Sequence, residues 1–220
     1  MVVLVTTSVA GCTSTSSSGI APTVASTTGT PTVVTPLQAP GTARTPSTPT
    51  AAPPAAGVGP VLPDPSWTPG AIDPDVSPGT IERTICVAGW TATVRPPESY
   101  TEEVKRLEAG RGGTVSYDGV TYQVHGFDLP DPEIGHYELD HLVPLELGGA
   151  PADPRNLWME PYEAPKGPAT PGTGSQTKDE VEDSARAAVC RGRLSLADAQ
   201  REIATDWYQL GRALGAIGTR

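Results

Sequence analysis

Asp140 and His141 stand next to each other, and this pair is the part of the sequence best suited to chemistry. An ionised carboxylate suits a hard cation such as Mg²⁺ or Mn²⁺, whereas an imidazole that titrates near neutrality can take a proton from water. Neighbouring residues on a strand point to opposite faces, so one side chain could hold a cation while the next faces an attacking water. Hydrolysis of a phosphodiester requires this division of roles.

The pair belongs to a longer string that includes Glu138, Gly148-Gly149 and Asn156-Leu157-Trp158. This string resembles the HNH nuclease motif. The resemblance implies a small ββα-metal unit in which Asp140 binds a divalent cation, His141 is the general base, and Asn156 braces the loop that carries the histidine. Glu138 would share a strand face with Asp140 and could support it through a hydrogen bond.

Further matches place the whole resemblance at roughly residues 80 to 208, where the chain looks like a bacterial group of secreted or surface HNH-like proteins. The family generally places a His or Asn near the start of the helix after the motif, shortly before a Lys. Here the stretch before Lys178 contains neither residue. Gln176 or Asp179 could take the place of that ligand, and Lys178 and Arg95 could contact phosphate.

Mg²⁺ or Mn²⁺ is the expected cation, with Ni²⁺ or Zn²⁺ as further candidates. A site whose only strong ligand is Asp140 would hold the cation loosely, together with substrate phosphate. Each candidate also has a structural interpretation: Asp140 as a strand-end salt bridge, His141 as a hydrogen-bonding histidine, and Asn156 as a turn residue. His125 and His136 lack metal-ligand spacing to a second His or Cys, so a zinc finger has little support.

The sequence Val9-Ala10-Gly11-Cys12 resembles a lipobox, which implies a signal segment at residues 1–12, a lipid on Cys12 and a membrane anchor facing outward. No positive charge precedes Cys12, although signal peptides normally begin with one. Two points therefore stay open: where the signal segment begins, and whether the chain is anchored to the membrane or secreted. Residues 13–79 are dominated by Ser, Thr, Pro, Ala and Gly, a composition that predicts a disordered linker before a domain at residues 80–220.

If Cys12 takes a lipid, Cys86 and Cys190 remain as an even pair, and an exported chain would join them in a disulfide. Two buried free thiols are the alternative. The elements around the motif predict an α+β fold, with an N-terminal hairpin turning at Asp118-Gly119 and helices at the C-terminal end. Helix starts are expected at Ser99, Thr177 and Ser195, each followed three residues later by an acidic residue.

From residue 81 onward, 14 Lys and Arg face 22 Asp and Glu, within a chain of net charge −10. This acidity opposes tight binding of nucleic acid, which depends on basic side chains that neutralise phosphates. We therefore expect an exported, lipid-anchored nuclease that binds DNA or RNA with low affinity and depends on a divalent cation. The alternative is an inactive HNH scaffold with a binding or envelope role, and a toxin delivered to other cells is a third hypothesis.

Overall fold

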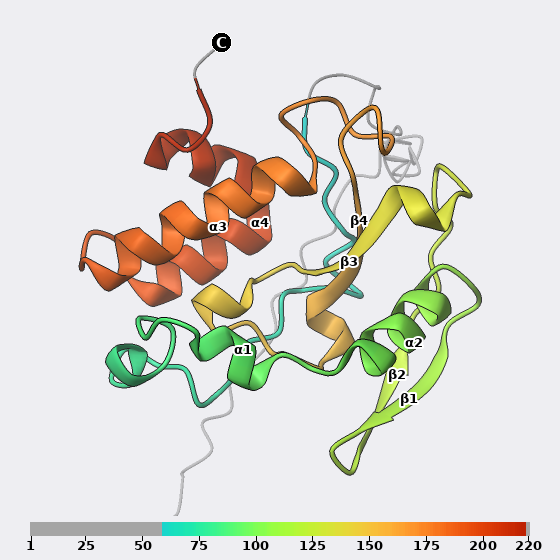
Figure 1. The fold of residues 1–220 in the computed structure, drawn as a ribbon, viewed down its shortest axis with the longest axis horizontal. Coiled ribbons are helices and arrows are strands. Elements are labelled where there is room, and N and C mark those ends of the chain that lie inside the picture. The colour runs from blue at the N-terminus through green and yellow to red at the C-terminus, as the bar shows by residue number, and fades with distance from the viewer. Residues whose placement is uncertain (1–58, 219–220) are drawn as a thin grey trace, which may run out of the picture. The chain divides into compact units, whose positions relative to one another are not determined.

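The structure, a computed structural model, describes residues 59–218. Within these residues the chain is mixed α+β, with four α-helices and two antiparallel sheets of two strands each (Figure 1). The expected signal segment 1–12, with Cys12, and most of the expected linker 13–79 lie outside the described residues. No helix in the described part of the chain is both long and apolar enough to span a membrane.

The elements follow one another as short helices, a hairpin, a second strand pair and two longer helices. Their bounds are α1 Trp90–Val94, α2 Glu98–Glu108, β1 Gly113–Tyr117, β2 Val120–Val124, β3 Tyr137–His141, β4 Leu157–Pro161, α3 Ser175–Cys190 and α4 Leu196–Leu214. Figure 1 shows α3 and α4 side by side on one side of β3 and β4, with α2 and the β1–β2 hairpin on the other. The β3–β4 sheet therefore lies between the α3–α4 pair and a layer made of α2 and the β1–β2 hairpin.

Local sequence signals explain some of these boundaries. The β1–β2 hairpin turns at Asp118 and Gly119, which both have positive φ as the Asp-Gly pair predicts. Ser195 caps α4 by accepting a hydrogen bond from the backbone N–H of Asp198 at 3.1 Å, again as predicted. In both places the residues that form the turn or the cap are close in sequence, so the local sequence pattern was sufficient to predict the structure.

The two other predicted caps are wrong. Ser99 lies inside α2, whose N-cap is Pro97, because the proline fixes an extended backbone just before the helix. Thr177 lies inside α3, and its backbone N–H and hydroxyl both donate to Glu163 Oε1, at 3.2 and 2.5 Å. The start of α3 is therefore capped by a distant carboxylate rather than by the helix's own residues.

The core has two parts, one on each side of the β3–β4 sheet. The first lies between α3 and α4 and includes Ile203 and Trp207, so the predicted apolar stripe of the last helix is core. The second joins α2 and the hairpin to Leu157 at the start of β4. The site residues described below lie where the sheet meets the first core.

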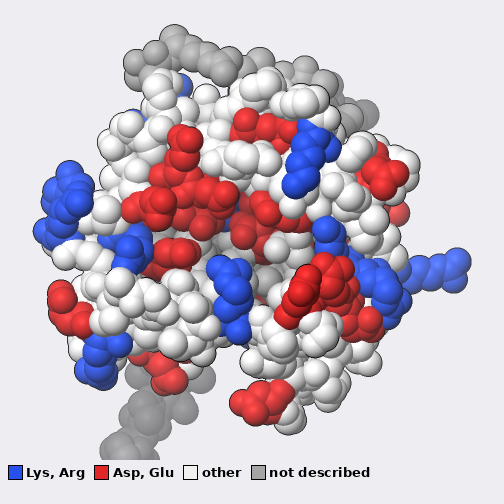
Figure 2. Space-filling view, viewed as in Figure 1, with Lys and Arg blue, Asp and Glu red and all other residues white. Residues whose placement is uncertain are grey.

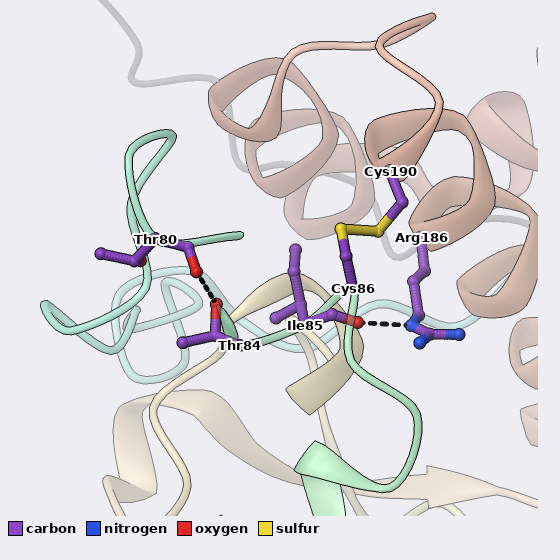
Figure 3. The surroundings of a disulfide bond; sticks show 6 residues. All are labelled: Thr80, Thr84, Ile85, Cys86, Arg186 and Cys190. Carbon is purple, nitrogen blue, oxygen red and sulfur yellow. Dashed lines mark hydrogen bonds between the residues drawn. A yellow bond between two sulfur atoms is a disulfide. The ribbon is translucent and has the colours of Figure 1, made fainter. Parts of the chain in front are cut away.

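A disulfide joins Cys86 to Cys190, across a sequence separation of 104 residues and a Cα–Cα distance of 5.6 Å (Figure 3). Beside it, Arg186 Nε donates a hydrogen bond of 2.7 Å to the carbonyl of Ile85. Figure 3 shows both links holding the segment before α1 against the C-terminal half of α3. The pairing predicted from the cysteine count is therefore present.

The compact part of the chain begins earlier than the predicted boundary at residue 80. Thr68 and Val76 are buried, and the backbone N–H of Asp73 donates to the carbonyl of Gly148 at 2.9 Å. Ile72 also forms an isolated bridge with Gly149. The Pro- and Ser-rich composition of this stretch conceals a few apolar and small residues that pack onto the loop between β3 and β4.

Candidate active site

Lys178 of α3 lies at the centre of a buried group of carboxylates from three elements. Its ammonium donates to Asp140 Oδ2 at 2.5 Å, to the carbonyl of His141 at 2.9 Å, and to Glu182 Oε1. Glu160 Oε2 lies 3.7 Å from the same nitrogen, and the Lys178 side chain is only 1% exposed. One cation therefore faces three acidic side chains with almost no access to water.

Strand register and helix periodicity bring these side chains together. Glu138 pairs with Glu160 across the β3–β4 sheet, and Asp140 pairs with Trp158. Cross-strand partners share a face, so Asp140 and Glu160 point to the same side of the sheet. Lys178 and Glu182 are four residues apart and lie on one face of α3, which packs against that side.

The charges in this group are strongly coupled. Burial alone would raise the pKa of Asp140, but the Lys178 charge and a hydrogen bond with Glu160 lower it to about 2. Burial raises the pKa of Glu160 well above its ordinary value and that of Glu182 to about 8. As a carboxylate Glu160 has no hydrogen-bond partner among the described residues, whereas as a carboxylic acid it can donate to Asp140.

His141 is buried at the end of β3, and its Nε2 lies 2.9 Å from the carbonyl of Pro151. That hydrogen bond requires a proton on Nε2, which leaves the lone pair of the neutral ring on Nδ1. Burial lowers the pKa of His141 despite the opposing charge of Asp140. At neutral pH the ring is therefore uncharged and able to accept a proton.

Asn156 holds the loop that follows His141. Its Oδ1 accepts from the backbone N–H of Val143 at 2.9 Å, and its Nδ2 donates to the carbonyls of Val143 and Ala150 at 2.9 and 3.2 Å. Its own carbonyl accepts from the backbone N–H of Leu142 at 2.8 Å. A Cβ at Gly149 would lie 1.7 Å from the Val143 carbonyl, so the tight approach of this loop requires glycine.

The three other predicted site residues, Asp179, Gln176 and Arg95, have different surroundings. Asp179 is exposed near Asp140 and Glu138, and partial burial together with these negative neighbours raises its pKa to about 6. Gln176 instead accepts a hydrogen bond from the backbone N–H of Glu163 at 3.0 Å. Arg95 is exposed and close enough to His141 for its positive charge to help lower the histidine's pKa, after burial as the main cause.

The phosphate contact predicted for Lys178 does not match its position, because its ammonium is enclosed by carboxylates. The sequence analysis also missed Glu160 and Glu182. The spacing of Lys178 and Glu182 was a readable signal for an ion pair. Glu160 could have been found only with the strand register, which sets it beside Asp140.

The fit of a metal ion to this site is partial. Among the described residues, no group of three or more His, Cys, Asp or Glu side chains is arranged to hold a metal ion. The Asp140 side chain is 24% exposed, and its Oδ2 accepts a hydrogen bond from the Lys178 ammonium. Asp179 lies close enough to Asp140 and Glu138 for their negative charges to raise its pKa. Figure 2 shows acidic side chains gathered across the middle of this face, over α3 and toward the β3–β4 sheet.

Comparison with known proteins gives no family for the chain. No protein-family model matches it, and searches among curated proteins and solved structures find no similar protein. The HNH resemblance therefore depends on the motif residues of the sequence alone.

Proposed function

We propose that the protein hydrolyses phosphodiester bonds in DNA or RNA at the site formed by β3, β4 and α3. The observation that carries the proposal is the position of His141, whose Nε2 lies 2.9 Å from the Pro151 carbonyl and whose neighbour in β3 is Asp140; burial also lowers the pKa of His141. The order strand, loop, strand, helix supports a ββα-metal unit of the HNH kind. This finer fold assignment is part of the proposal.

In the proposed reaction His141 Nδ1 takes the proton from the attacking water, while Nε2 keeps its bond to the Pro151 carbonyl. Asn156 keeps the following loop in place, so the imidazole does not turn away from the substrate. Lys178 fixes the carboxylate of Asp140 through Oδ2. A divalent cation, with Asp140 and the substrate phosphate as ligands, would supply positive charge beside the scissile phosphate.

Charge limits the affinity of this site for nucleic acid. The chain carries a net charge of −10, and Figure 2 shows acidic side chains gathered near the middle of the face that it draws, with Lys and Arg side chains around them. Counter-ion release from phosphates therefore contributes little, and we expect weak binding that depends only slightly on salt. Export and attachment of the chain to a membrane through Cys12 also belong to the proposal, because residue 12 lies outside the described residues.

A second candidate function is supported by the ion pair of Lys178. The Lys178 ammonium compensates the negative charge of Asp140, which is what a bound metal ion would do. Unlike a metal ion, this cation is part of the chain. Such a site could have lost catalysis and retained the scaffold. The protein would then be an inactive surface lipoprotein with a binding or envelope role.

Cleavage assays separate these candidates. We would incubate the full chain with supercoiled plasmid and with single-stranded RNA, in Mg²⁺, Mn²⁺, Ni²⁺, Zn²⁺ or EDTA. The proposal predicts metal-dependent cleavage that Asp140→Asn removes and that the exposed Asp183→Asn leaves unchanged. Absence of cleavage with every metal, by a folded and disulfide-bonded sample, would favour the inactive scaffold.

A further inference from the structure

A cavity of about 530 Å³ lies apart from the residues proposed for hydrolysis. It is formed by the end of α2, the end of β2, the segment before Gly70 and the loop before β4. The lining residues that matter for recognition are Trp67, Thr68, Glu108, His125 and Phe127. This cavity is large enough for a ring the size of a nucleobase and its sugar.

Two buried polar atoms in this lining lack partners. Thr68 Oγ1 and Glu108 Oε2 make no hydrogen bond within the described residues, and both side chains belong to residues that are 1% exposed. A buried hydroxyl or carboxyl without a partner is unfavourable, because it has lost its hydrogen bonds to water and gained none in the protein. A ligand that hydrogen-bonds to both atoms would remove that penalty.

Glu108 is an unusual residue for its position. It is the last residue of α2, where the helix dipole disfavours an anion, and burial raises its pKa to about 9. At neutral pH it is therefore a carboxylic acid, which offers a hydrogen-bond donor and an acceptor side by side. The complementary ligand is a group with a donor next to an acceptor, such as an amide or amidine edge.

The remaining wall is aromatic and well supported. The Trp67 ring stacks on His125 with a centroid distance of 3.7 Å and an interplanar angle of 5°. His125 in turn meets Phe127 edge-on, with centroids 4.9 Å apart. Trp67 is nevertheless 49% exposed, so this fixed ring keeps a surface on which another planar ring can stack.

We propose that this cavity binds a nucleobase, which stacks on Trp67 and pairs through its edge with Glu108 and Thr68. Nucleobases combine a flat ring with adjacent donors and acceptors, whereas a purely apolar ligand would leave both buried atoms unpaired. A base inside a duplex is stacked and paired already, so the cavity selects single-stranded nucleic acid or loops. The inference rests on the proposed function, which supplies nucleic acid as the ligand.

The test measures binding in the absence of cleavage. The full chain is titrated in EDTA with the four common nucleoside 5′-monophosphates, and ribose 5-phosphate serves as the ligand without a base. We expect at least one nucleotide to bind and ribose 5-phosphate to bind at least about tenfold more weakly, as expected for loss of base stacking. Equal binding of both ligands, or no binding of any nucleotide, would overturn the inference.

Variants test the two recognition elements separately. Trp67→Ala should weaken binding by about tenfold or more, because it removes the stacking surface. Glu108→Leu should abolish binding, whereas Glu108→Gln, which keeps a donor and an acceptor in the same shape, should stay within about threefold of the parent. Unchanged binding by Glu108→Leu would contradict the assigned edge contact, and near-ultraviolet circular dichroism would verify that each variant is folded.

Failure of this inference is distinguishable from failure of the proposed hydrolysis. Nucleotide binding by a chain that cleaves nothing would support the cavity and reject the nuclease. Metal-dependent cleavage by a chain that binds no nucleotide would do the reverse.

Discussion

At the scale of single residues, the positive charge of Lys178 compensates the buried acidic side chains around it. Its ammonium is the only cationic group that contacts Asp140, Glu160 and Glu182 within the described residues. Without it, acidic side chains would be left in a region of low dielectric constant, where an unpaired charge is strongly unfavourable.

Replacing this lysine should therefore destabilise the fold severely. Lys178→Met should lower the free energy of unfolding by about 3–5 kcal/mol at pH 7, measured by urea denaturation. Lys166→Met, at an exposed residue whose ammonium lies over the Tyr162 ring, should cost about 1 kcal/mol or less. Equal effects of the two substitutions would contradict the central place of Lys178.

The loss in Lys178→Met should depend on pH. Burial raises the pKa of Glu160 and Glu182 above the ordinary carboxyl value in the native protein, and removal of Lys178 would raise them further. A raised carboxyl pKa means that the folded state binds more protons, so stability is greatest below the unfolded value and falls as pH rises. The deficit of Lys178→Met should therefore shrink from pH 8 to pH 5, and a deficit that is constant over this range would exclude this cause.

The sequence indicated part of this residue-scale arrangement. Asp140 and His141 were identifiable because their chemistry is evident from two adjacent letters. The enclosure of Lys178 was not, because a lysine near a helix start is usually solvated. Its burial comes from contacts with Asp140 and His141 of β3 and with Glu160 of β4, which only the tertiary fold brings to α3. Which acids surround it depends on strand register, and that is a property of the tertiary fold.

At the scale of elements, the loop between β3 and β4 depends on one side chain. Asn156 makes three side-chain hydrogen bonds to the backbone of that loop and is fully buried. The loop also carries Pro151, which orients His141. A substitution that loosens this loop should therefore lower the stability of the protein and also change the orientation of the His141 imidazole.

Asn156→Asp is the sharper of two substitutions for this loop. The carboxylate keeps an acceptor for the Val143 N–H but cannot donate to the carbonyls of Val143 and Ala150. We expect a loss of about 2–4 kcal/mol in thermal or urea unfolding, because two buried acceptors lose their partner and a charge is buried. Asn156→Ala should fall in the same range, and a loss below about 0.5 kcal/mol for either variant would show that the loop is held by other contacts.

A sequence pattern can predict the boundary of a helix or hairpin when the residues that set that boundary are near neighbours in the chain. The Asp118-Gly119 turn and the Ser195 cap depend on neighbours within a few residues, so their patterns were sufficient. The start of α3 depends on Glu163, which reaches Thr177 only after the intervening loop has folded back. No local pattern could have revealed that contact.

For the whole molecule, the disulfide is the main covalent constraint. Cys86 and Cys190 close a loop with a sequence separation of 104 residues, and the bond ties the segment before α1 to α3. In the chain-entropy account, a loop of this length restricts the unfolded state by about 4–5 kcal/mol. We therefore expect the stability of the domain to depend on this bond.

Removal of both cysteines tests that dependence. The double variant Cys86→Ser/Cys190→Ser should lose about 2–5 kcal/mol of stability, with a matching fall in melting temperature measured by calorimetry. The parent protein under reducing conditions should fall by a similar amount, which provides the control. A double variant as stable as the oxidised parent would show that the helical core alone holds these segments together.

The extent of the compact part was the least predictable property at this scale. The average composition of residues 13–79 predicts a linker, yet Thr68 and Val76 are buried and Trp67 lines a cavity. Sparse apolar residues among prolines and serines can pack onto a surface that is already folded, and composition alone does not reveal that surface. The same segment supplies Trp67 and Thr68, two of the three residues proposed to contact the nucleobase.

The most direct test of the proposed function is the rate at which His141→Asn nicks supercoiled plasmid in Mg²⁺ or Mn²⁺. Asparagine is polar and smaller than histidine but cannot take a proton from water, so the rate should fall by about 10²–10⁴-fold in a folded protein. A His141→Asn variant that nicks plasmid as fast as the parent, or a parent that shows no metal-dependent nicking, would contradict the proposed nuclease.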